Sequence, residues 1–210
     1  VLIVVHGSSR NAGGYRHHFA AAARRYGALL LAPAFRRANY RGSRRCNLGN
    51  IKSRAGRTTP RSAWSFLVID RVFDEARAQL GFGQQRYFLF GHSAGSQFVH
   101  RMIMFSPSKK MIAAVAANAG WYTEPDPTID FPYGLNDAPA KKESLRQAFR
   151  QKLTVMLGQD DINEAHRGLR STAEANRQGP HRLARGYHFY RRSKEIAEQL
   201  RVPFLWRLKE

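Results

Sequence analysis

Strand-like and helix-like segments alternate along the whole chain, and no other feature restricts its fold as much. Short apolar runs rich in β-branched and aromatic residues are typical of buried strands, whereas apolar residues at helical spacing are typical of helices that pack on a sheet. The expected strands cover 1–5, 28–35, 87–91, 110–120, 153–158 and 201–208, and the expected helices cover 16–27, 62–81, 96–105, 141–152 and 186–200. This order predicts an α/β fold, in which a mostly parallel sheet carries helices on both faces.

The size and the ends of the chain limit what it can be. The 210 residues suit one domain spanning 1–210, and 43% of them are apolar, as in ordinary globular proteins. No apolar run approaches the ~20 residues that a membrane-spanning helix needs. The chain opens on the apolar segment 1–5 and closes on 201–208, so we expect the fold to be incomplete at both ends. Cys46 is the single cysteine, which excludes an internal disulfide and slightly favours the cytoplasm, although the start of the chain does not decide the compartment.

The chain is strongly basic, with 35 Lys and Arg residues against 15 Asp and Glu residues and a net charge of +20. Such a field attracts anions, including nucleic acids, anionic lipids and acidic substrates. The charge is densest over 36–61, a segment with nine Lys or Arg residues and no acid, and its composition predicts a loop. A loop of this length is unusual in a compact domain unless it is functional or mobile. No nucleic-acid-binding motif surrounds it, so nucleic acid is an unlikely partner, and binding of another polyanion and an ordinary basic surface both stay open.

The stretch "RYFLFGHSAGSQF" places Ser93 at the turn between an expected strand and an expected helix. Gly91 and Gly95 lack a β-carbon, so the strand and the helix can pass close to one another on either side of the serine. A helix that begins after Ser93 directs free backbone N–H groups towards an anion at the turn. Serine hydroxyls become nucleophiles only when a base removes their proton, so the turn needs partners elsewhere in the chain.

With a strand before it and a helix after it, "GHSAG" matches a nucleophile elbow, and the chain resembles the α/β-hydrolases. It is most similar to esterases of the polyhydroxybutyrate depolymerase type, through the stretches "VVHGSSRNA", "GHSAGSQFVHR", "ANAGWYT" and "TVMLGQDD". These stretches span most of the chain in the order that the family requires. The resemblance implies a serine esterase that cleaves small or polymeric carboxylic esters through an acyl-enzyme on Ser93, without a cofactor.

The resemblance also implies partners for Ser93. The backbone amides of Ala94 and Ser8 are the expected oxyanion-hole donors, and each such donor is typically worth about 3 kcal/mol in the transition state. The acid of the triad follows a strand later in the chain. The usual spacing after a glycine selects Asp161 over its neighbour Asp160, which remains the alternative.

The catalytic histidine is the missing partner. The family places it in the loop after the last strand, and here the expected last strand, 201–208, is followed only by two residues up to Glu210. Among the histidines present, only His188 is a candidate substitute. We therefore expect the 210-residue chain by itself to be a poor catalyst, because removing a triad member leaves only a residual rate.

Two aromatic residues, Trp121 and Tyr122, open the Pro- and Asp-rich segment 121–140, which suggests a lid or a rim. They are expected either to line the acyl or alcohol site or to lie at its rim. No metal-ligand spacing and no phosphate-binding loop is present. Besides the esterase, a second interpretation stays open: a non-catalytic protein of the hydrolase fold that binds polyanions through 36–61.

Overall fold

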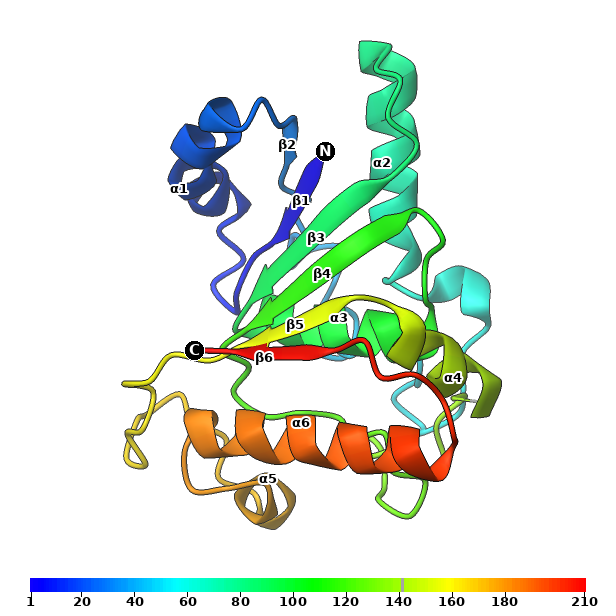
Figure 1. Ribbon diagram of the computed structural model, residues 1–210, viewed down its shortest axis with the longest axis vertical. Helices are drawn as coiled ribbons and strands as arrows, with labels where there is room; N and C mark the ends of the chain where they lie inside the picture. Colours follow the sequence, from blue (N-terminus) through cyan, green and yellow to red (C-terminus); the bar gives the residue numbers. More distant parts are fainter. Residues whose placement is uncertain (141) are drawn as a thin grey trace.

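The computed structural model describes residues 1–140 and 142–210, and its centre is a parallel sheet (Figure 1). Within these residues, six strands pair in the order β2-β1-β3-β4-β5-β6, and every neighbouring pair is parallel. The strands are β1 (Leu2–Val5), β2 (Leu30–Leu31), β3 (Tyr87–His92), β4 (Met111–Ala117), β5 (Leu153–Met156) and β6 (Arg207–Lys209). The predicted α/β fold with a mostly parallel sheet is confirmed.

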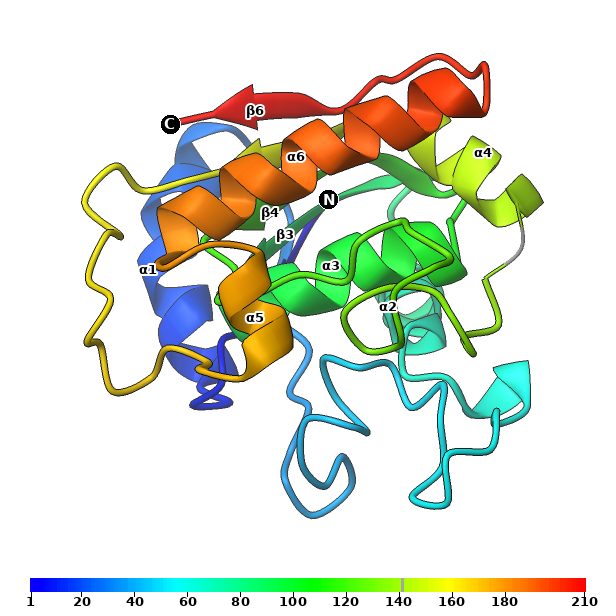
Figure 2. The same cartoon turned by 90° about the horizontal axis from the view of Figure 1, so that it is seen from below.

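Helices lie on both faces of this sheet, although one face is covered only in part and Phe88 on it is 47% exposed (Figures 1 and 2). They are α1 (Ala12–Arg25), α2 (Leu67–Leu80), α3 (Ala94–Phe105), α4 (Lys142–Arg150), α5 (Ala173–Arg177) and α6 (Arg182–Gln199), with a 3-10 turn at Arg61–Ala63. The side chains of Leu89 and Val155 point into the core shared with α2, α3, α4 and α6. Successive side chains of a strand point to opposite faces, so Phe90 points to the other face of the sheet, where its ring centroid lies 4.8 Å from that of Phe19 in α1.

Helix α3 lies at the centre of the core, and every residue from Gly95 to Phe105 is buried. The ring centroid of Phe98 lies 5.1 Å from those of both Phe35 and Phe66, so the helix is packed against the segments that flank the basic loop. Burying an aromatic side chain of this size stabilises a fold by about 1.5–3 kcal/mol. The start of α3, and Ser93 with it, is therefore held in place by the core.

The edge strands are shorter than predicted. The expected strand 28–35 is reduced to β2 (Leu30–Leu31), and 201–208 is reduced to β6 (Arg207–Lys209). Each pairs on one side only, with β1 and β5 respectively, so their remaining residues have no ladder to join. Apolar composition predicts burial, but a strand also needs a partner along its whole length.

Helix boundaries also differ from the expected ones. The helix expected over 62–81 begins at Leu67, because Trp64 adopts an extended conformation after the 3-10 turn. The helix expected over 186–200 begins earlier, at Arg182, where the His181 ring accepts from the Ala184 amide. Of the helix expected over 141–152, Lys142–Arg150 is helical, and Lys141 lies outside the described residues.

The segment 36–61 forms a series of turns, as its composition predicts. Arg10, which follows β1, stabilises the start of this segment. Its guanidinium donates hydrogen bonds to the carbonyl oxygens of Phe35, Tyr40 and Gly42, at 2.5, 2.9 and 2.9 Å. Across residues 1–140 and 142–210, none of the helices combines the length and apolar character that crossing a bilayer requires.

Candidate active site

Ser93 lies where β3 ends and α3 begins, in a backbone conformation that few serines adopt. Its φ is 56° and its ψ is −114°, a combination outside the regions that residues with a β-carbon favour, and strained residues of this kind cluster at active sites. A β-carbon on Gly91 would lie 2.2 Å from the carbonyl oxygen of Gly95, and one on Gly95 would lie 2.2 Å from that of Val5. A side chain at either glycine would push α3 away from the sheet.

The turn at Ser93 forms part of the wall of a cavity of about 600 Å³. Ser8, Ser93, Ala94 and Trp121 all line this cavity, so the structure brings four of the six predicted site residues together. The cavity lies at the carboxyl ends of β1, β3 and β4, which is where ligands bind in parallel α/β sheets. Neither the Ser8 amide nor the Ala94 amide donates a hydrogen bond to another described residue.

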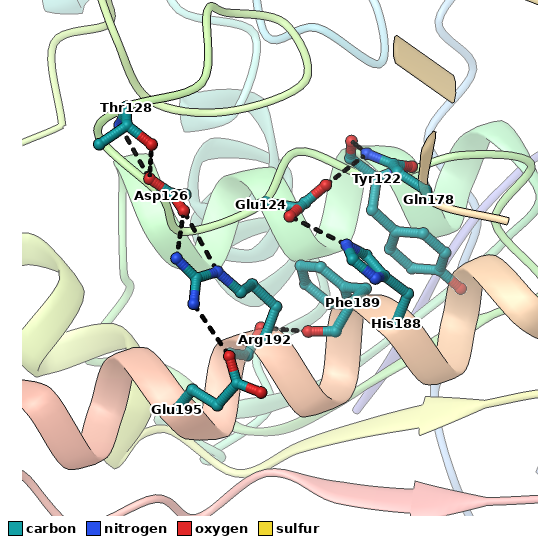
Figure 3. A network of polar contacts seen from close by, with 10 residues as sticks. Tyr122, Glu124, Asp126, Thr128, Gln178, His188, Phe189, Arg192 and Glu195 are labelled. Atoms are coloured by element: carbon teal, nitrogen blue, oxygen red, sulfur yellow. Dashed lines mark hydrogen bonds and ion pairs between the residues drawn. The ribbon is translucent and has the colours of Figure 1, made fainter. Parts of the chain in front are cut away.

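Tyr122 lies elsewhere, contrary to the expectation that it lines the substrate site. It is fully buried, and its ring stacks on Phe189 of α6 with the centroids 4.5 Å apart (Figure 3). The amide of Gln178 bonds both the N–H and the carbonyl oxygen of Tyr122. The side chain of Trp121 points to the cavity wall, whereas that of Tyr122 points into the core, so the two neighbouring aromatic residues have different surroundings.

Asp161, the predicted acid, lies just after β5 and is ion-paired. Its carboxylate accepts from Arg182 of α6 at 2.8 Å, and Arg182 itself lines the cavity. Asp160, the alternative, is exposed. Burial lowers the pKa of His92, the residue before Ser93, and the negative charge of Asp161 opposes part of that effect. The field of Asp161 therefore reaches the turn that holds Ser93.

No histidine forms a hydrogen bond to the Ser93 hydroxyl within the described part of the chain. His92 Nδ1 is bonded to the Tyr15 hydroxyl at 2.7 Å, and His166 Nδ1 lies 2.9 Å from Arg182. His188, the candidate substitute base, lies on α6 and pairs with Glu124 at 3.1 Å (Figure 3). Each of these three imidazoles therefore interacts with a residue other than Ser93.

Two further histidines are buried and structural. His6 Nδ1 bonds the Gly7 carbonyl oxygen at 3.0 Å, and His6 Nε2 accepts from the Phe35 amide at 3.1 Å. Burial lowers the pKa of His6, and burial lowers that of His100 well below the usual value. In residues 1–140 and 142–210, no three His, Cys, Asp or Glu side chains are grouped as metal ligands would be.

The arginines of this site are a feature that the sequence did not predict. No acidic side chain is among the described residues that line the cavity. Five arginines line it: Arg10, Arg37, Arg167, Arg170 and Arg182. They come from four segments that are far apart in the sequence, and the only signal that could have suggested them was the net charge of +20.

Comparison with known proteins identifies close structural relatives, although no family model and no curated protein sequence matches the chain. Poly(aspartic acid) hydrolase-1 from Sphingomonas sp. KT-1 is 42% identical, with a TM-score of 0.96 over 99% of this chain and 79% of that one. LpqC, a poly(3-hydroxybutyrate) depolymerase from Bordetella parapertussis, is 36% identical, with a TM-score of 0.94 over 99% of this chain and 70% of that one. The chain therefore belongs to the family of α/β-hydrolases that includes this poly(3-hydroxybutyrate) depolymerase and this poly(aspartic acid) hydrolase.

Proposed function

We propose that the protein is a serine hydrolase that cleaves carboxylic esters, of the polyhydroxyalkanoate type or smaller, through an acyl-enzyme on Ser93. The observation that carries this proposal is the position of Ser93, at positive φ on the wall of a cavity that Ser8 and Ala94 also line. A strained turn that exposes a serine beside two free amides suits attack on a carbonyl carbon.

The reaction balances as follows in this proposal. Ser93 Oγ bonds to the carbonyl carbon and gives its proton to a base, while the amides of Ser8 and Ala94 bind the oxyanion. The carbon–oxygen bond to the alcohol then breaks, the alcohol takes the proton, and the acyl group stays on Ser93. Water, activated by the same base, releases the acid and regenerates the serine.

The base is a histidine oriented by Asp161, and none of the described histidines forms a hydrogen bond with the Ser93 hydroxyl. We therefore expect the 210-residue chain by itself to turn over esters slowly, with only the cavity and the oxyanion-hole amides contributing. With the catalytic histidine beside Ser93, the carboxylate of Asp161 would accept a hydrogen bond from its imidazole, either in place of the bond from Arg182 or together with it.

Replacing Ser93 tests the proposal most directly. In the complete gene product, Ser93→Ala should lower kcat/KM for p-nitrophenyl butyrate by at least about 10³-fold while the circular dichroism spectrum stays unchanged. Ser43→Ala is the matched control, since Ser43 lines the same cavity at an exposed position of the basic loop and should change kcat/KM less than about twofold. Retained hydrolysis in Ser93→Ala would exclude the proposed nucleophile.

A second function, non-catalytic binding of a polyanion, is supported by one observation: the basic segment 36–61 supplies part of the cavity wall. In that case heparin should bind the complete gene product whether or not Ser93 is present. Reversing the charge of three exposed arginines, in Arg41→Glu, Arg45→Glu and Arg54→Glu together, should then weaken heparin binding at least tenfold. Unchanged heparin affinity would leave the segment as ordinary surface.

A further inference from the structure

The cavity at Ser93 holds more positive charge than its surroundings neutralise. The five arginines that line it come with one carboxylate partner, Asp161, which pairs with Arg182. Guanidinium groups that gather without acids repel one another, and this repulsion opposes folding. A ligand that supplies the missing negative charge would turn this repulsion into binding energy.

Not all five arginines are available for a ligand. Arg10 donates to three carbonyl oxygens of the basic loop, and Arg182 is held by Asp161. Arg37 donates one long bond, 3.3 Å, to the Ser8 carbonyl oxygen. In contrast, Arg167 has no hydrogen bond or ion pair with any described residue, and Arg170 uses only its Nε, which donates to the Tyr133 hydroxyl at 2.8 Å.

Arg170 is also positioned for binding. Its guanidinium carbon lies 5.4 Å from the centroid of the Trp121 ring and 5.9 Å from that of Tyr133, and these two rings pack together 4.8 Å apart. Buried Arg101 lies on Trp121 as well, at 4.4 Å, which fixes the ring in turn. The bond to Tyr133 and the two ring contacts orient the Arg170 fork, while its two terminal nitrogens keep their donors free of described protein acceptors.

A free guanidinium fork on an aromatic support suits a carboxylate, which it binds through two parallel hydrogen bonds. One cavity of about 600 Å³ is lined by Ser93, Trp121, Arg167 and Arg170. A single small substrate in this cavity can therefore place a carboxylate at the arginines and its ester group at the serine. The exposed arginines of 36–61, which forms the adjoining wall, extend the positive field away from the cavity.

We propose that Arg167 and Arg170 bind a free carboxylate of the substrate, so that the protein prefers acyl groups carrying a second acid function over neutral ones. The proposal rests on the proposed function, because it assigns a specificity to the same site. It names Arg167 and Arg170 as specificity-determining residues that touch the substrate without taking part in the bond changes. A polyanionic chain would place further carboxylates along the basic segment.

Two esters with one leaving group test this preference. The complete gene product should hydrolyse p-nitrophenyl hemisuccinate with a kcat/KM at least about tenfold above that for p-nitrophenyl butyrate, after correction for their spontaneous rates. Replacing both arginines, in Arg167→Gln with Arg170→Gln, should reduce that ratio to within about twofold of unity. Arg86→Gln is the matched control, because Arg86 is exposed and precedes β3, at the opposite edge of the sheet from the cavity.

A binding measurement separates this proposal from the proposed function. Calorimetry with the Ser93→Ala variant and oligoaspartate should give a Kd that rises at least tenfold in the double arginine variant and less than twofold in Arg86→Gln. Ser93-dependent hydrolysis with equal rates on both esters would overturn the carboxylate preference alone. Retained ester hydrolysis in the Ser93→Ala variant would overturn the proposed function alone. A Kd for oligoaspartate that is the same with and without the two arginines would overturn the carboxylate site.

Discussion

Charged side chains meet in two regions of this molecule, and the two regions treat charge in opposite ways. Between segment 121–140 and α6, Glu124 pairs with His188 at 3.1 Å and Asp126 pairs with Arg192 at 2.5 Å (Figure 3). In the cavity at Ser93, the exposed residues Arg167 and Arg170 form no ion pair with a described carboxylate. The first arrangement holds elements of the fold together, whereas the second is the carboxylate site proposed above.

The paired region keeps the carboxylate of Asp126 ionised inside the fold. Asp126 is only 3% exposed. It accepts from the N–H and the hydroxyl of Thr128, and from two nitrogens of Arg192. Burial alone would raise the pKa of this carboxyl, but the hydrogen bonds from Thr128 and Arg192 together lower it below its usual value. The ionised form is therefore the one that stabilises the fold.

The largest effect is expected when this pairing is broken from the acid side. Asp126→Asn should lower the free energy of unfolding by about 2–3 kcal/mol at pH 7, because Arg192 then faces an amide donor in place of a carboxylate. Urea denaturation measures the change. Asp137→Asn is the control: the side chain of Asp137 is 82% exposed in its pair with Lys52, and such pairs contribute at most about 1 kcal/mol. Equal losses in the two variants would contradict the distinction drawn for Asp126.

Buried imidazoles provide a second, smaller contrast, because they sit beside arginines and remain neutral. Burial lowers the pKa values of His6 and His100, and the charges of Arg10 and Arg101 add to this effect. A lowered pKa in the folded state means that the unfolded chain binds more protons below pH 6.5, so folding stability falls as the pH falls. His100, whose pKa lies well below the usual value, should cost about 1 kcal/mol between pH 6.5 and pH 5.5.

Urea denaturation at pH 7.5, 6.5 and 5.5 measures this loss. His100→Gln should flatten the pH dependence, because the amide oxygen can still accept from the Thr123 N–H that His100 Nε2 now binds, without taking up a proton. An unchanged slope in His100→Gln would mean that this imidazole does not titrate differently in the folded and unfolded states.

The sequence predicted the surroundings of Ser93 well because the signals there are local. The strand, the two glycines and the helix lie within about twenty residues, and each follows from the residues themselves. The lengths of β2 and β6 were wrong because pairing depends on neighbours elsewhere in the chain. Tyr122 was misplaced for a similar reason, since its burial is decided by Phe189 of α6.

The two charged regions were harder still to predict. Asp126 and Arg192 are 66 residues apart, and Glu124 and His188 are 64 residues apart. The cavity arginines likewise come from the β1 turn, the basic loop, the loop after β5 and the start of α6. Composition predicted a basic protein that attracts anions, but only the fold shows which arginines remain without partners.

The smallest expected effect is the sharpest test of the comparison. If Arg167 is held for a ligand and not for the fold, Arg167→Gln should change the free energy of unfolding by less than about 0.5 kcal/mol. Any change should be stabilising at low salt, because one repulsive charge leaves the cavity, and should vanish in 0.5 M salt, where the screening length is below about 5 Å. Arg192→Gln removes the same charge from the paired region and should destabilise by about 1–2 kcal/mol, because Asp126 stays buried without its cation. Urea denaturation of the two variants at low and high salt makes the comparison. A loss in Arg167→Gln that matches the loss in Arg192→Gln would mean that Arg167 stabilises the fold as Arg192 does, and that its lack of a carboxylate partner does not mark a ligand site.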